Sequence, residues 1–145
     1  ENWRTSSTLN GNPNGSDTID LDVWMADNRV VDLSADPDGD HRPSLFEFAT
    51  GRDPNLFDPA GSVQSAIIEI DEQSFAAIIL QQRIGADRIT VGAQRSGDLL
   101  NWTEGPRYFG RTNNGDGTSS VWFVSSTGVS TNEQEFLRVE ITSDP

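Results

Sequence analysis

The chain has 145 residues and a formal net charge of −13, with neither lysine nor cysteine. Its length fits one domain with at most a small additional segment, and its acidity argues against nucleic-acid binding, which requires a basic surface. The lack of cysteine excludes disulfides and thiolate metal sites, and no apolar stretch approaches the roughly 18 residues of a membrane span.

The N-terminal part of the chain predicts little regular structure. Residues 1–16 are polar and rich in Asn, Gly and Ser, which favours an extended or loosely held arm. Scattered apolar residues between 18 and 33 permit a short helix, and residues 17–33 have no other predicted role. Because the chain starts at Glu1 rather than Met, we expect it to be a processed or excised piece of a longer precursor.

The acidic segment 36–47 has the residue spacing of a calcium-binding loop. Counted from its first aspartate, carboxylates fall at positions 1, 3, 5 and 12. In an EF-hand loop, these positions supply side-chain oxygens and position 7 supplies a main-chain carbonyl. Hard oxygen ligands in a flexible arrangement suit Ca²⁺ better than Mg²⁺. The predicted ligands of a Ca²⁺ ion are therefore Asp36, Asp38, Asp40, Arg42 and Glu47, the alternative being a solvated acidic turn.

The loop departs from the EF-hand pattern near its centre. His41 occupies position 6, where the sharp turn prefers glycine, so we expect a strained, left-handed backbone there. Pro43 at position 8 removes the amide through which paired EF-hand loops join, which predicts an isolated loop. A helix is predicted over 44–50, ended by Gly51. Since this helix carries Glu47, its folding and the capture of the metal should be coupled.

From residue 62 onward, the pattern changes to strands. Apolar runs at 66–70 and 74–82 flank the turn Asp71-Glu72-Gln73, which predicts a hairpin. Short strands joined by Gly-rich turns, without long helices, favour an antiparallel sandwich. The predicted fold class is mainly β. A small antiparallel β-sandwich over residues 61–145 follows a segment, residues 1–60, that holds the N-terminal arm, the EF-hand-like calcium loop and one short helix. Further strands are predicted at 88–95, 119–126 and 135–142, and one more is allowed near 106–109.

Several of these motifs together resemble a module found near the C-termini of large secreted proteins of environmental bacteria. Its calcium loop is similar to thrombospondin type-3 and dockerin loops. The resemblance implies secretion and a calcium-stiffened junction leading into a small β-rich module, without implying one biochemical activity. The chain departs from that family's usual Gly, Ser and Asn at His41, Pro43 and Ser44. The matching residues are Trp3-Arg4, Asp36-Pro37-Asp38-Gly39-Asp40, Glu47-Phe48-Ala49, Gly51-Arg52-Asp53-Pro54, Gln82-Arg83, Ser96-Gly97-Asp98-Leu99-Leu100-Asn101-Trp102 and Phe136-Leu137-Arg138-Val139.

We therefore expect a secreted, non-catalytic, calcium-binding structural module. An enzyme is disfavoured because the single histidine, His41, lies inside the loop and no GxSxG, HExxH or phosphate-binding glycine loop occurs. One alternative is a carbohydrate-binding accessory module that uses Trp102, Tyr108 and Trp122. Strand alternation over 121–124 leaves open which side chains of that strand face the core. Another alternative is a calcium-stabilised subunit of an extracellular assembly, with copies joined through open sheet edges.

Overall fold

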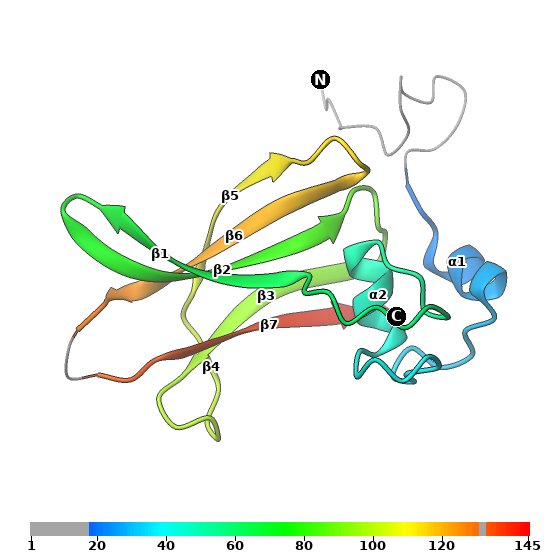
Figure 1. The fold of residues 1–145 in the computed structure, drawn as a ribbon, viewed down its shortest axis with the longest axis horizontal. Helices are drawn as coiled ribbons and strands as arrows, with labels where there is room; N and C mark the ends of the chain where they lie inside the picture. Colours follow the sequence, from blue (N-terminus) through cyan, green and yellow to red (C-terminus); the bar gives the residue numbers. More distant parts are fainter. Residues whose placement is uncertain (1–17, 131–132) are drawn as a thin grey trace.

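The computed structural model of the protein describes residues 18–130 and 133–145, so the predicted N-terminal arm and Trp3-Arg4 lie outside the described residues. Its strands form two antiparallel sheets, one of four strands in the order β1-β2-β6-β5 and one of three in the order β4-β3-β7 (Figure 1). The predicted mainly β sandwich is therefore confirmed. The elements are α1 (Leu21–Asn28), α2 (Ser44–Thr50), β1 (Val63–Ile70), β2 (Gln73–Arg83), β3 (Ile89–Ser96), β4 (Thr103–Glu104), β5 (Arg107–Asn113), β6 (Thr118–Gly128) and β7 (Phe136–Ser143).

The β1–β2 hairpin has a tighter turn than the sequence predicted. Gln73 belongs to β2 and pairs with Ile70, so the turn consists of Asp71 and Glu72 alone. Both turn residues have left-handed backbones, with φ of 50° and 63°. Two consecutive residues with positive φ define a type I′ turn, whose twist matches that of antiparallel strands. The register then runs without interruption from Val63 opposite Leu80 to the turn.

The sandwich core lies between the two sheets. Ile78 of β2 and Phe123 of β6 pack against Ala93 of β3, with Leu137 of β7 beside them. Val121 belongs to the same cluster. This settles the alternation left open by the sequence, since Val121 and Phe123 face the core and Trp122 between them projects from the opposite face of the sheet.

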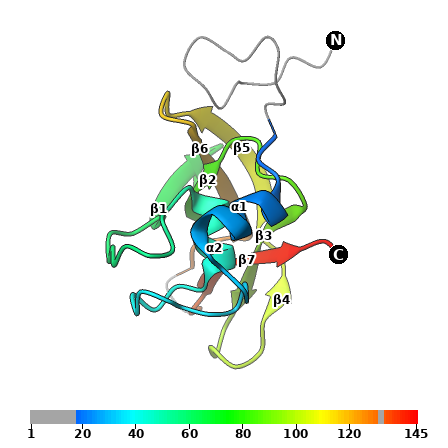
Figure 2. The same ribbon diagram turned by 90° about the vertical axis from the view of Figure 1, so that its right-hand side faces the viewer.

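Two helices of the described residues cover one end of the sandwich (Figure 2): α2, which was predicted, and α1, which lies where the sequence permitted a short helix. Helix α1 begins where the Asp20 carboxylate accepts hydrogen bonds from the amides of Asp22 and Val23, at 2.9 and 3.0 Å. Buried Trp24 of α1 meets Phe48 of α2 with ring centroids 5.1 Å apart.

This helical cluster is continuous with the sandwich. Ala86 and Ile89 pack against it from the β2–β3 loop and the start of β3. The Arg83 guanidinium lies 5.5 Å from the Phe48 ring and donates a 2.8 Å hydrogen bond to the Phe48 carbonyl oxygen. Neither helix of the described chain has the length and apolarity that crossing a membrane requires.

The type I′ turn yields a prediction about stability. A residue other than glycine pays roughly 1–2 kcal/mol for a left-handed backbone, so Glu72→Gly should raise the free energy of unfolding by about 0.5–1 kcal/mol. Chemical denaturation measures this change. The matched control, Glu69→Gly near the end of β1, should lower stability by about the same amount. A destabilised Glu72→Gly protein would contradict the assigned turn.

Candidate metal centre

The loop before α2 is folded by its own aspartates. Asp36 accepts hydrogen bonds from the amides of Gly39 and His41, at 2.8 and 2.9 Å. Asp38 accepts from the amide of Asp40, at 3.1 Å. His41 has a φ of 72°, the left-handed conformation that an EF-hand loop assigns to glycine at this position. The strain expected at position 6 is therefore present in the structure.

This folding brings three of the predicted ligands together. Asp36, Asp38 and Asp40 each offer a carboxylate oxygen, and these oxygens lie within 4.8 Å of one another. Asp40 is the most enclosed of the three, with 8% of its surface exposed. Unit charges at such distances repel by about 1 kcal/mol per pair even in water, and by more where water is excluded. The three oxygens form the kind of anionic cluster that a divalent cation would neutralise.

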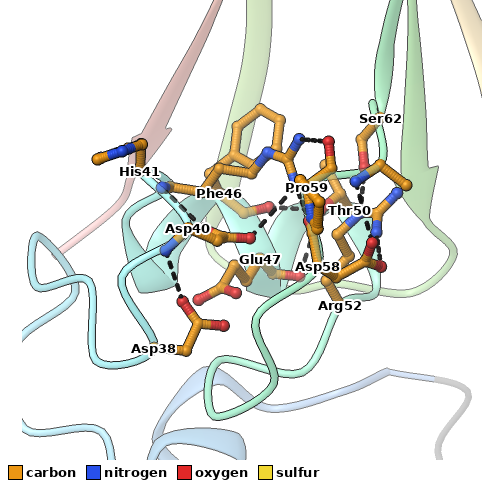
Figure 3. A network of polar contacts seen from close by, with 12 residues as sticks. Asp38, Asp40, His41, Phe46, Glu47, Thr50, Arg52, Asp58, Pro59 and Ser62 are labelled. Atoms are coloured by element: carbon orange, nitrogen blue, oxygen red, sulfur yellow. Dashed lines mark hydrogen bonds and ion pairs between the residues drawn. The ribbon is translucent and has the colours of Figure 1, made fainter.

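Glu47 of helix α2, the remaining predicted carboxylate ligand, lies outside this group of three but points toward it (Figure 3). The residue is only 1% exposed, and its Oε2 atom is buried without a hydrogen-bond partner among the described residues. The Oδ2 atom of Asp38 is in the same state. Figure 3 shows the carboxylates of Asp38 and Glu47 directed toward one another, with Asp40 beside them. Since buried polar atoms in folded proteins are almost always paired, two unpaired oxygens facing the same place are groups that a cation could satisfy.

The electrostatics of the cluster favour the same conclusion. Burial, followed by the negative charges of Asp38, Asp40 and Asp36, raises the pKa of Glu47 from 4.5 to about 7. The pKa of Asp38 is also raised, first by desolvation and then by the neighbouring carboxylates. Without a cation, the site must therefore hold a proton or bear strong repulsion. All four side chains offer hard oxygen ligands, which is the preference of Ca²⁺.

Arg42, the predicted main-chain ligand, also has a side-chain role that the sequence did not reveal. Its amide donates a 2.9 Å hydrogen bond to Asp40 Oδ1, and its guanidinium is 3.3 Å from Asp40 Oδ2. The same guanidinium donates to the main-chain oxygens of Asp58 and Pro59, the latter at 3.1 Å. Arg42 thus ties the acidic loop to the segment that leads into β1.

Arg52 holds the same segment from a second direction. It donates to the Asp58 carboxylate and, at 2.5 Å, to the hydroxyl of buried Ser62. We call Arg42, Arg52, Asp58, Pro59 and Ser62 the arginine clamp. A signal for it exists in the sequence, because Arg42 and Arg52 are the only arginines between positions 30 and 82, and lysine is absent. The spacing of the sequence alone, however, does not show which of the many acidic residues Arg42 and Arg52 contact.

The three candidate sugar-binding aromatics do not form one surface. The Trp102 ring is covered by the Arg138 guanidinium at 4.3 Å, and its Nε1 donates to the Leu99 carbonyl oxygen at 3.2 Å. Tyr108 of β5 is 57% exposed and meets the core residue Phe123 edge-on. Trp122 belongs to the opposite face of that sheet. The three aromatic side chains therefore do not share a common surface.

The Ser96–Trp102 turn that carried part of the family resemblance is held by one aspartate. Asp98 accepts hydrogen bonds from the amides of Leu100 and Asn101, at 2.9 and 2.8 Å. The Asn101 side chain and the Ser96 hydroxyl also donate to it. These donors, the Asn101 amide first, hold the pKa of Asp98 far below its usual range. The aspartate and asparagine of this motif therefore shape the turn.

Comparison of the chain with protein-family models, with curated proteins and with solved structures finds no match. The geometry of the site itself is therefore what supports a function.

The raised pKa of Glu47 predicts how stability depends on pH in the presence of a chelator. The folded state binds the Glu47 proton more tightly than the unfolded state, so this contribution is full below pH 4.5 and is lost as pH rises through about 7. We expect the metal-free protein to lose about 1–2 kcal/mol across this range, once solvent screening is allowed for. Thermal unfolding with EDTA at several pH values measures the loss. Glu47→Gln, which keeps the shape and removes the charge, should flatten the profile, and an unchanged profile in this variant would contradict the assignment.

Proposed function

We propose that this chain is a secreted, non-catalytic structural module in which bound Ca²⁺ fixes the N-terminal segment against the β-sandwich. The observation that carries the proposal is Glu47, a fully buried carboxylate with an unpaired oxygen, which points toward Asp38 and Asp40 of the aspartate cluster (Figure 3). A buried charge of this kind is costly unless an opposite charge meets it. A divalent cation supplies that charge and takes up the free oxygens.

The four carboxylates and the Arg42 main-chain carbonyl are the groups that would hold the ion. Ca²⁺ takes six to eight oxygen ligands at 2.3–2.6 Å, so water would complete the shell. Neither cysteine nor a histidine other than His41 is present to bind a softer metal. Extracellular calcium modules bind at about 10⁻⁴–10⁻³ M, and the strained turn at His41 is compatible with this range.

The ion would stiffen the junction by two routes. Along the first, Glu47 is adjacent to Phe48, which is fully buried in the cluster of α1, α2 and the start of β3. Holding Glu47 therefore holds α2 against the end of the sandwich. Along the second, Asp40 contacts Arg42, and the arginine clamp reaches Ser62, the residue before β1. Metal binding would thereby order both the helix and the entry to the first strand.

Calcium should raise the melting temperature of the protein, and removing one ligand should abolish the rise. At a free Ca²⁺ concentration 100 times Kd, the expected stabilisation is about 2.7 kcal/mol. Thermal unfolding with Ca²⁺ or with EDTA, at matched ionic strength, measures it, and titration calorimetry should give one ion per chain. Asp38→Asn and Glu47→Gln should lose the effect. Asp27→Asn, an equal charge change at an exposed residue of α1, should keep it. A melting temperature insensitive to Ca²⁺ would overturn the proposal.

Removing the Arg42 guanidinium should leave Ca²⁺ binding in place but abolish the Ca²⁺-dependent stiffening of the segment before β1. Arg42→Ala keeps the main-chain carbonyl, so calorimetry should still detect Ca²⁺ binding. The guanidinium bonds to Asp58 and Pro59 are lost, so Ca²⁺ should no longer increase amide-exchange protection in residues 58–64. The control is Arg29→Ala, which removes an exposed arginine at the end of α1. Calcium-dependent protection of this segment in Arg42→Ala at the wild-type level would rule out the clamp as the route.

A further inference from the structure

We propose that two copies of this chain pair through the free edge of β1, so that their four-stranded sheets join into one antiparallel sheet across a two-fold axis. The proposal rests on β1 alone and is independent of the metal centre. Figure 1 shows β1 as the outer strand of its sheet, with β2 on its inner side.

Of the four sheet edges in the described chain, β1 is the one without protection against pairing. Folded proteins blunt their edges with very short strands, bulges, charged side chains or proline. β4 has only two residues, and β5 has a bulge between Tyr108 and Gly110. β5 also carries two arginines, and β7 carries an arginine and a glutamate. By contrast, β1 is eight residues long with an unbroken register, contains no proline, and has one charge, Glu69.

The hydrogen-bonding groups of this edge can be assigned from the hairpin. Ile70 and Gln73 flank the two-residue turn as a hydrogen-bonded pair, and such pairs alternate along an antiparallel ladder. The bond from the Gln81 amide to the Ser62 carbonyl oxygen, 2.8 Å long, agrees with this alternation. The N–H and C=O groups of Val63, Ser65, Ile67 and Glu69 therefore point away from β2. No hydrogen bond within the described residues reaches them from another element.

These groups are self-complementary about a two-fold axis at Ala66. Antiparallel pairing centred there places Ser65 opposite Ile67 of the second copy and Val63 opposite Glu69 of the second copy. Each pair exchanges two hydrogen bonds, which gives about eight across the edge. Both members of a pair then lie on the same face, so the two sandwich cores continue on the same side of the joined sheet.

Charge supports a second copy as the occupant of the edge. With a net charge of −13, two chains can approach closely only through a surface poor in carboxylates. In the register centred on Ala66, the two Glu69 residues stand six positions apart along the strands, about 20 Å. No like charges face each other. Pairing also covers Ile67, whose side chain is 63% exposed beside a groove of about 380 Å³ between the hairpin and β7.

The test is the mass of the protein in solution. Sedimentation equilibrium over a concentration series up to about 500 µM, in physiological salt, should show a monomer of 15.9 kDa converting to a dimer. Ser65→Pro removes an outward amide without removing a bond to β2, and Ile67→Lys adds a charge at the centre of the edge. Both variants should remain monomeric over the same series. Val31→Lys, which places the same charge at a 93% exposed loop residue, should dimerise like the wild type.

Two outcomes would overturn the pairing. One is a wild-type protein that remains monomeric at the highest concentration, which would leave the edge for a strand of another protein. The other is a dimer that persists in both edge variants, which would place the interface elsewhere. Far-ultraviolet circular dichroism and melting temperatures establish that Ser65→Pro and Ile67→Lys are folded. Repeating the series with EDTA should leave dimerisation in place, because β1 does not contribute a ligand to the metal centre.

Discussion

The mutual repulsion of four carboxylates constrains how the N-terminal half of this chain can pack. Asp36, Asp38 and Asp40 lie together because their own main-chain hydrogen bonds fold the loop that way. Glu47 joins them because the next residue, Phe48, must be buried for α2 to cover the end of the sandwich. The packing of α2 therefore buries the Glu47 carboxylate, away from water and beside other negative charges. A bound cation would convert this cost into a stabilising contact and make the closure of the junction depend on metal.

The connection from this centre to the sandwich is polar rather than hydrophobic. Exposed Leu56 and Phe57 lie in the loop between α2 and β1 and contribute little to burial. The loop is held instead by the guanidinium groups of Arg42 and Arg52, which bond to Asp58, Pro59 and Ser62. Arginine suits this role because its planar group donates several hydrogen bonds at once. The clamp ends one residue before β1, so the strand proposed to pair with a second copy begins where the junction proposed to depend on metal stops.

The parts of the structure that the sequence predicted are those encoded by local spacing. Short apolar runs bounded by turn residues located the main strands, and the short apolar run before Gly51 located α2. The alternate aspartates followed by Glu47 predicted a cluster, and the three aspartates are together in the structure. A left-handed backbone at His41 was expected from the loop pattern and is present.

The features that the sequence did not reveal depend on tertiary contacts. Helix α1 has a weak apolar pattern and depends on the Asp20 cap and on Trp24 packing against Phe48. The hydrogen bonds of the arginine clamp join partners up to 17 positions apart, and nothing in the spacing marks these partners in the sequence. The sequence did not show which face of the sheet the Trp122 side chain occupies, because alternation assigns two faces to a strand without saying which one is buried. The three-residue turn predicted at 71–73 was wrong by one residue, since Asp71 and Glu72 adopt left-handed backbones without glycine.

A crystal structure determined in millimolar Ca²⁺, with anomalous data collected at a wavelength where calcium scatters strongly, would test the central claim most directly. If Ca²⁺ binds between the carboxylates, an anomalous peak should appear bounded by Asp36, Asp38, Asp40 and Glu47. Its oxygen ligands should lie at about 2.3–2.6 Å, with the main-chain carbonyl of Arg42 among them. Water alone between these carboxylates, or a Glu47 side chain turned out to solvent, would contradict this claim.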